Sequence, residues 1–158
     1  ARERGPREGG RGTGRERGDR LCVAGMSGER DLNALIKSMS ATLVDGLYVF
    51  CTVQRDAVPE GLTPRMRFEE DEGTTLILPL SQAQAAGLKF EYPCRMITLN
   101  VHSSLEAVGF LARVTAELSK HGMSVNAVTG FYHDHLFVPE GKEQDALWYL
   151  RDMSRTHH

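Results

Sequence analysis

The chain has 158 residues, of which 41% are hydrophobic and 25% are charged, and its formal net charge is −2. This composition fits a globular protein of one domain or two small ones and excludes collagen-like and low-complexity chains. No apolar run approaches the roughly 20 residues that a membrane-spanning helix needs, so we expect no membrane association.

Residues 1–25 differ from the rest of the chain. They hold seven Arg and four acidic residues, a net of +3, whereas the remainder carries −5. The segment is rich in glycine and cannot bury enough apolar surface to offset chain entropy, so we predict that it is disordered. It has no interleaved aromatic residues, which favours a solvated extension, or sequence upstream of a start at Met26, over a nucleic-acid-binding tail. We therefore expect no nucleic-acid partner.

A short helix and a strand are predicted next. Apolar residues recur at helical spacing over 32–39, and Asp31 is a suitable N-cap because its carboxylate can accept a backbone N–H of the first turn. Residues 46–53 are rich in β-branched and aromatic side chains, which predicts a strand.

A hairpin and a second short helix follow. Residues 66–70 and 74–78 have strand character and are separated by an Asp-Glu-Gly turn. Ser81 and Gln84 have the spacing of a capping box, which predicts a helix that ends at Gly87. A strand is expected to start at Phe90, with Pro93 at a bend before the next strand.

Residues 103–138 form the most informative block, and together with the strand before it they give the order strand, helix, strand, strand. Residues 96–101 are apolar and β-branched, as in a strand buried on both faces. Ser103 and Glu106 form a predicted capping box at the start of a helix that ends at Gly122. The helix face expected to be buried consists of Val108, Leu111, Ala112, Thr115 and Leu118.

Two strands and a final helix complete the pattern. Residues 123–129 alternate in polarity, Gly130 marks a turn, and residues 131–138 are a second strand-like run. The helix predicted over 142–153 has an inward face made of Ala146, Leu147, Leu150 and Met153. This order predicts an α+β protein of two units, 26–93 and 94–158, each with an antiparallel sheet covered by helices.

Most of the chain after residue 25 resembles small stand-alone proteins built of tandem ACT domains. The segments that carry the likeness are residues 31–35, 48–52, 75–79, 95–99, 102–109 and 132–139. The second half is also similar to the ACT domains of aspartate kinases, through Val108-Gly109 and residues 122–126. The resemblance implies two ferredoxin-like βαββαβ units that pair through their sheets and bind amino acids or similar metabolites. Because such sheets expose edges, we also expect a homodimer.

A ligand site is expected at the start of the helix that follows residue 102. The first turn of a helix offers free N–H groups and a partial positive charge, which suit a carboxylate, and the facing strand could hold an amino group. The candidate ligand-binding residues are His102, Ser103, Ser104, Leu105, Val108, Gly109, Val125, Asn126 and Ala127. The simpler alternative is that Ser103 only caps the helix.

His133 and His135 form the most conspicuous polar pair. On a strand they share a face while Asp134 points to the other, and two histidines are too few for a zinc site unless a residue such as His102 joins them. We treat them as weak metal candidates and favour hydrogen bonding at an interface. The cysteines Cys22, Cys51 and Cys94 lack metal-type spacing, which favours free thiols in a reducing cytoplasm.

No nucleophile elbow, phosphate loop or catalytic carboxylate pair occurs in the sequence, so we expect neither an enzyme nor a cofactor. The sequence favours a regulatory or sensor protein that binds a small metabolite, most simply an amino acid. The competing hypothesis is a structural module for homo-oligomerisation or enzyme docking that binds no ligand.

Overall fold

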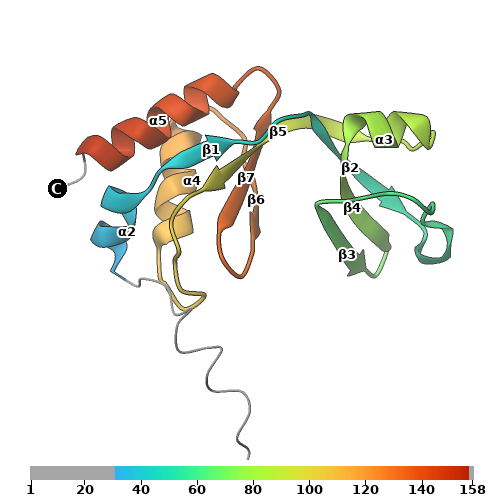
Figure 1. Cartoon of the computed structure of the whole chain (residues 1–158), viewed down its shortest axis with the longest axis horizontal. Coiled ribbons are helices and arrows are strands. Elements are labelled where there is room, and N and C mark those ends of the chain that lie inside the picture. Colours follow the sequence, from blue (N-terminus) through green and yellow to red (C-terminus); the bar gives the residue numbers. More distant parts are fainter. Residues whose placement is uncertain (1–30, 157–158) are drawn as a thin grey trace, which may run out of the picture.

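The computed structural model describes residues 31–156, so the predictions for residues 1–25 lie outside the described part. The helices are α2 (Leu32–Ser38), α3 (Leu80–Ala85), α4 (Phe110–Lys120) and α5 (Glu143–Thr156), with a 3₁₀ turn, η1 (Arg55–Ala57). The strands are β1 (Ala41–Leu43), β2 (Tyr48–Val53), β3 (Met66–Glu70), β4 (Gly73–Pro79), β5 (Glu91–Leu99), β6 (Asn126–Thr129) and β7 (Asp134–Pro139). Figure 1 shows two lobes, one around β2–β4 and α3 and the other around the remaining helices, joined through β5.

The two lobes share one antiparallel sheet. Its strand order is β3-β4-β2-β5-β7-β6, and β1 also pairs with β5. The start of β5 pairs with β2, through Tyr48 opposite Cys94, and its end pairs with β1, through Ala41 opposite Leu99. β5 is therefore the last strand of the first lobe and the first strand of the second. The predicted α+β class, with an antiparallel sheet and covering helices, is confirmed.

The N-terminal elements α2 and β1 belong spatially to the second lobe. β1 lies beside β5 in the fourth-strand position of a βαββαβ unit. Leu35, Ile36 and Met39 join the same buried cluster as Leu118 and Leu150. Two elements that precede residue 93 thus complete the core built by the residues that follow it.

The first lobe has a reduced version of the βαββαβ pattern. Between β2 and β3, where the pattern has its first helix, the chain forms only η1, which buries no residue. Its separate core lies between the sheet and α3, and consists of Val49, Cys51, Leu76, Leu78 and Ala83. Burial raises the pKa of the Cys51 thiol, which fits a thiol that packs as an apolar side chain.

β5 continues through Pro93, so the predicted break between two strands is wrong. The irregularity lies at Tyr92, which has a φ of 60° where the register of β2 and β5 shifts. Such a bulge bends a strand without ending it, and it leaves room for the proline. The Tyr92 hydroxyl donates a hydrogen bond to the carbonyl oxygen of Phe137 at 3.0 Å, which fixes the bend against β7.

The helix-start predictions have mixed outcomes. Asp31 is the N-cap of α2, since its Oδ1 accepts a hydrogen bond from Ala34 N at 2.9 Å. The capping box at Ser81 is wrong, because α3 begins at Leu80 after Pro79. The capping box at Ser103 is also wrong: α4 begins at Phe110.

Residues 103–106 form a turn instead of a helix start. Ser104 Oγ accepts a hydrogen bond from Glu106 N at 3.1 Å, a local bond that competes with helix formation. The buried face of α4 is Phe110, Val114 and Leu118, whereas Val108 is 85% exposed.

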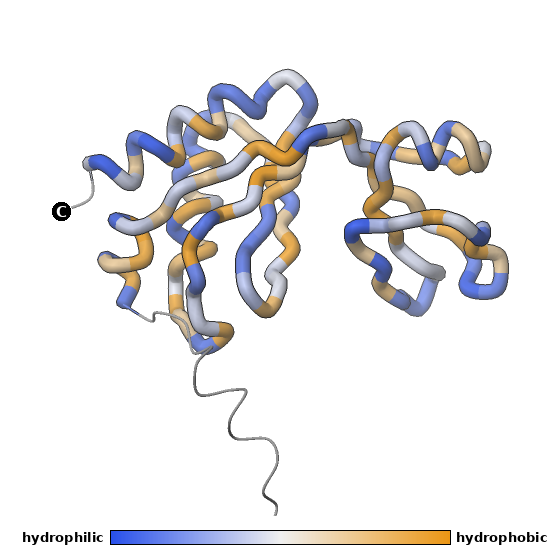
Figure 2. The backbone as a smooth tube through the Cα atoms, viewed as in Figure 1, coloured by the Kyte–Doolittle hydropathy of each residue, from blue (hydrophilic) through white to orange (hydrophobic). Residues whose placement is uncertain are grey.

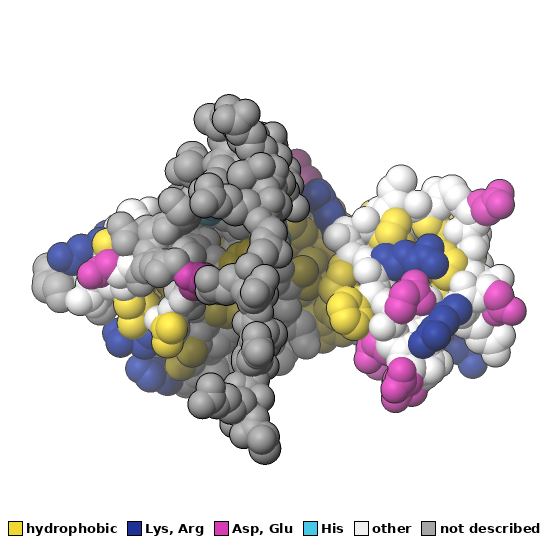
Figure 3. Space-filling model, turned by 90° about the horizontal axis from the view of Figure 1, so that it is seen from below, with side chains coloured by type: hydrophobic (Ala, Val, Ile, Leu, Met, Phe, Trp, Pro, Cys, Tyr) yellow, Lys and Arg dark blue, Asp and Glu magenta, His cyan; other side chains and the backbone are white. Residues whose placement is uncertain are grey.

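The β3–β4 turn is hydrophilic (Figure 2). Viewed from below, the first lobe carries acidic and basic side chains next to one another on its surface (Figure 3). Within residues 31–156, none of the helices is both long and apolar enough to span a membrane.

Candidate ligand-binding site

A pocket of about 200 Å³ lies beneath the start of α4, on the helix-covered face of the second lobe. Three segments form it: the loop before α4, the first turn of α4, and the β6–β7 hairpin. The lining residues are Ser103, Ser104, Leu105, Ala107, Phe110, Leu111, Thr129, Gly130 and Asp134. At about 30 Å³ per water molecule, the pocket holds a ligand of only a few heavy atoms.

Asp134 supplies a buried carboxylate to this pocket. It is the first residue of β7, it is 5% exposed, and no hydrogen bond to its side chain occurs within residues 31–156. Its strand neighbours Leu136 and Val138 point to the same face and belong to the core. The only buried side-chain atom without a hydrogen-bond partner in the described residues is Arg95 Nε, so the Asp134 carboxylate still reaches the solvent of the pocket, where a cation or a donor can approach it.

The N-terminus of α4 lies on the other side of the pocket. Gly109 is its N-cap, with a left-handed φ of 88°, and no side chain caps the helix. The N–H groups of the first turn therefore have no intrahelical acceptor, and the helix dipole adds a partial positive charge there. Ser103, Ser104 and Thr129 also line the pocket and bring hydroxyl groups to it.

The pocket thus presents free N–H donors on one side and a carboxylate on the other. The first suits an anionic group, and the second suits an ammonium group. A small zwitterion could therefore place its anionic group at the N–H groups of α4 and its ammonium group at the Asp134 carboxylate.

Two ACT-domain models match the chain, over residues 27–95 and residues 91–152. A crystal structure of a protein of unknown function from Vibrio cholerae, described as a possible transport protein, is 43% identical; the match covers 78% of this chain and 95% of that one, with a TM-score of 0.70. The chain belongs to the ACT-domain family. No curated protein shows a significant match.

More distant structures share the ACT fold. A protein from Agrobacterium tumefaciens is 15% identical, with a TM-score of 0.61 over 73% of this chain and 89% of that one. The regulatory subunit of aspartate kinase from Thermus flavus is 11% identical, with a TM-score of 0.54 over 73% of this chain and 95% of that one. The fold of this chain therefore resembles the regulatory ACT domains of aspartate kinases.

The predicted loop residues lie at or near the pocket of the second ACT unit. Ser103, Ser104 and Leu105 line it, and Gly109 caps the helix above it. His102 lies outside the lining, with its ring centroid 6.0 Å from that of Tyr132. Val108 points into solvent.

The predicted strand residues lie elsewhere. Val125 and Asn126 line a separate groove between α4 and the segment before β6. Asn126 is paired with Phe137, which belongs to the core on the opposite face of the sheet, so the Asn126 side chain points away from the Ser103 pocket. Ala127 is exposed on the edge strand. The residues that face Ser103 and Ser104 are instead Thr129, Gly130 and Asp134.

The two histidines lie on and beside β7. Their ring centroids are 6.4 Å apart, and Nδ1 of His135 is 3.0 Å from Thr98 Oγ. Burial, together with the neighbouring charges of His133 and Arg65, lowers the pKa of His135, while Asp134 opposes this effect. Within residues 31–156 no group of three or more His, Cys, Asp or Glu side chains is arranged to hold a metal ion.

Proposed function

We propose that this protein is a non-enzymatic regulatory protein that binds a small amino acid in the pocket beneath α4. The observation that carries the proposal is the buried, unpartnered carboxylate of Asp134 opposite an uncapped helix N-terminus. The two groups have the charges that an α-ammonium and an α-carboxylate require.

The ligand carboxylate accepts hydrogen bonds from the first-turn N–H groups of α4 and from the hydroxyl of Ser103 or Ser104. The ammonium group pairs with Asp134 and with Thr129 Oγ. The ligand side chain then lies against the apolar parts of Leu105 and Leu111, which also line the pocket. The small volume favours amino acids with short side chains.

Binding at this place ties α4 to the sheet. Asp134 begins β7, β7 pairs with β5 along Cys94–Thr98, and β5 continues into the first lobe. A ligand that bridges α4 and Asp134 therefore stabilises the one strand that both lobes share. This connection supports a sensor function, in which binding of the ligand changes the arrangement of the two lobes that a partner protein contacts.

Exposed apolar side chains surround the pocket and support a homodimer. Leu105 is 63% exposed, Val108 85%, and Phe131 54%. Leu105 lines the pocket, Val108 precedes α4, and Phe131 follows Gly130, which also lines it; exposed apolar side chains of this kind favour an interface. A second copy that covers them would also exclude water from the pocket and strengthen its ionic contacts.

A thermal-shift screen of the full chain with the common amino acids, followed by calorimetry, tests the proposal. At a hundredfold excess over its dissociation constant, a ligand should stabilise the fold by about 2.7 kcal/mol. Ser104→Phe should fill the pocket and abolish this gain. If no amino acid stabilises the parent protein, the proposal fails.

The second candidate function is a structural module for oligomerisation or enzyme docking that binds no ligand. The exposure of Leu105, Val108 and Phe131 favours it independently of the pocket. Self-association that persists in Ser104→Phe, in a protein that no amino acid stabilises, would support this function.

A further inference from the structure

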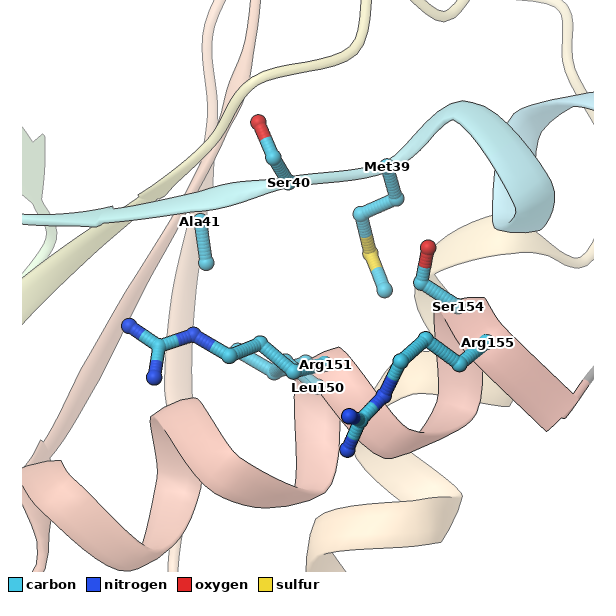
Figure 4. A pocket seen from close by; sticks show the side chains of 7 residues that line it. All are labelled: Met39, Ser40, Ala41, Leu150, Arg151, Ser154 and Arg155. Carbon is cyan, nitrogen blue, oxygen red and sulfur yellow. The ribbon is translucent and has the colours of Figure 1, made fainter.

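The pocket of about 230 Å³ between β1 and α5 does not bring its charged groups together. Figure 4 shows that Arg151 and Arg155 extend from α5 in different directions, so their guanidinium groups do not converge on one ligand. A smaller pocket, at the junction of the two lobes, combines charged and apolar groups from both sides.

This junction pocket has a volume of about 130 Å³. The first lobe contributes Arg65 and Met66, which begins β3, and the second lobe contributes His135 on β7. Figure 1 shows β3 and β7 in the two different lobes, which are joined through β5. The remaining lining is apolar and comes from β5, β6 and β7: Met96, Val128 and Phe137. His135 therefore lies where the first lobe approaches the second.

Aromatic side chains hold the lobes together beside this pocket. The ring centroid of Phe137 lies 6.0 Å from that of Tyr48 and 5.9 Å from that of Phe50, and both pairs of rings are nearly perpendicular. The pairing of β2 with β5 shifts register between Tyr48 and Phe50, so the ladder that joins the lobes is irregular. An unfilled pocket next to an irregular ladder leaves room for a change in the angle between the lobes.

Arg65 is held on the first-lobe side of the pocket. Its Nε donates a hydrogen bond to the hydroxyl of Tyr48 at 3.1 Å, and its guanidinium carbon lies 5.7 Å from the centroid of the Tyr48 ring. Arg65 is exposed, so solvent weakens its repulsion of other positive charges. Its charge nevertheless disfavours a second positive charge on His135.

His135 is the group in the pocket that titrates near neutral pH. Its Nδ1 lies 3.0 Å from Thr98 Oγ on β5. Burial is the main cause that lowers the pKa of His135; the charges of His133 and Arg65 add to this effect, and Asp134 opposes it. The side chains that β5 and β6 contribute to the pocket are uncharged. The closed junction thus favours the neutral ring.

We propose that the junction pocket is a pH-sensitive contact between the lobes, which is closed around a neutral His135 and opens when the imidazole ring takes up a proton. A charged ring requires hydration that the apolar lining does not supply, and it would share the pocket with the guanidinium group of Arg65. In the open arrangement water reaches the ring and the distance from Arg65 increases. Protonation therefore favours opening.

The sign and the range of the response follow from linkage. In the open arrangement the pKa of His135 returns toward its ordinary value of 6.5, and in the closed arrangement it is lower. Between these two values the open arrangement binds more protons, so its population rises as the pH falls below about 6.5. Opening exposes Met66 and Met96, and it requires no ligand in the pocket beneath α4.

The test uses the full chain, labelled at its methionine methyl groups, in NMR spectra with a soluble paramagnetic agent that relaxes solvent-exposed methyl groups. Met66 and Met96 report on the junction, whereas Met39 and Met153 belong to the core of the second lobe and are internal controls. We expect the relaxation of Met66 and Met96 to rise about twofold or more between about pH 7.5 and about pH 5.5, with no change at the controls. A rise at all four methyl groups would show unfolding of the whole chain and overturn the proposal, as would no rise at Met66 and Met96.

Three variants identify the titrating group. His135→Gln removes the ring but keeps a side chain that can hydrogen-bond to Thr98, so it should abolish the pH response. Arg65→Gln should reduce the response, because the repulsion is lost while the burial of the ring remains. The matched control is His121→Gln, which replaces a histidine that stacks on Tyr149 and does not line the junction pocket. It should respond like the parent. A His135→Gln variant that still responds, or a control that loses the response, would assign the opening to another group and overturn the proposal.

Discussion

Asp134 is paired directly with Thr129 across the β6–β7 hairpin, and both residues line the pocket beneath the first turn of α4. The pairing places a buried carboxylate and a hydroxyl on the same face of the sheet, opposite free N–H groups. The ligand selectivity of the pocket therefore depends on one hairpin and one helix end, and each can be changed separately.

Asp134→Asn should abolish amino-acid binding while leaving the fold at least as stable. Losing one partner of a buried charge pair costs about 2 kcal/mol or more, which is at least about 30-fold in affinity. The Asp134 side chain makes no hydrogen bond within residues 31–156 that the substitution would break, so the melting temperature of the unliganded protein should not fall. Calorimetry and thermal melting measure the two effects. Asp71→Asn, in the exposed β3–β4 turn, is the control and should bind like the parent.

Gly109→Ala should lower the free energy of unfolding by about 1–2 kcal/mol, because a residue with a side chain is strained in the left-handed region. Crowding is not the cause, since an added Cβ would meet only Leu32 Cδ2, at 3.7 Å. Gly109→Asn should recover part of the loss, because asparagine tolerates this conformation. Equal denaturation midpoints for the two variants would contradict the explanation.

Tyr92→Phe should cost about 0.5–1.5 kcal/mol of stability, because its hydroxyl donates to the Phe137 carbonyl oxygen and holds the bend of β5. Tyr149→Phe is a suitable control. Tyr149 stacks on His121, and its hydroxyl makes no hydrogen bond within the described residues. Urea denaturation of the two variants separates the effect of the hydrogen bond from that of the substitution itself.

Much of the fold follows from local sequence patterns. The sequence predicts the N-cap role of Asp31, the β3–β4 hairpin and the alternation of Asp134 with His135. Each of these features depends on residues that are close together in the chain. The position of β1 was not predictable, since a three-residue strand is specified by its partner β5 rather than by its own composition.

The candidate site was predicted only in part. The sequence places Ser103 and Ser104 in the candidate site because they resemble the start of a helix. They do line the pocket, although α4 begins at Phe110. In the sequence, Asp134 stands out only as the residue between two histidines. Strand alternation already placed it on the face opposite His135, but only the packing of α4 shows that this face is the covered one.

The stability of the fold should fall as the pH drops below about 6.5. Burial, followed by the charges of His133 and Arg65, lowers the pKa of His135 from its ordinary value of 6.5. The unfolded chain then binds more protons than the folded one between the lowered pKa and 6.5, so acidification favours unfolding. His135→Gln should flatten this dependence. Denaturation at several pH values measures the slope, and NMR titration of the His135 ring reports its pKa directly; a pKa above 6.5 would contradict the prediction.

The edge of β6 should pair with a second copy of the chain. Gly130 N donates to His133 O at 2.9 Å, so the alternating ladder turns the N–H groups of Ala127 and Thr129 away from β7. Beside this free edge lies a groove of about 560 Å³, lined by small residues of α4 such as Ala112 and Ala116.

Ala127→Pro removes one outward donor without breaking the β6–β7 hairpin. We expect a dimer for the parent protein at micromolar concentration, and a folded monomer for this variant. Light scattering and circular dichroism test both statements. Val128→Pro is the contrasting variant, because the N–H of Val128 faces β7 and its loss should damage the hairpin itself. A parent that stays monomeric, or an Ala127→Pro variant that remains dimeric, would exclude the β6 edge as the interface.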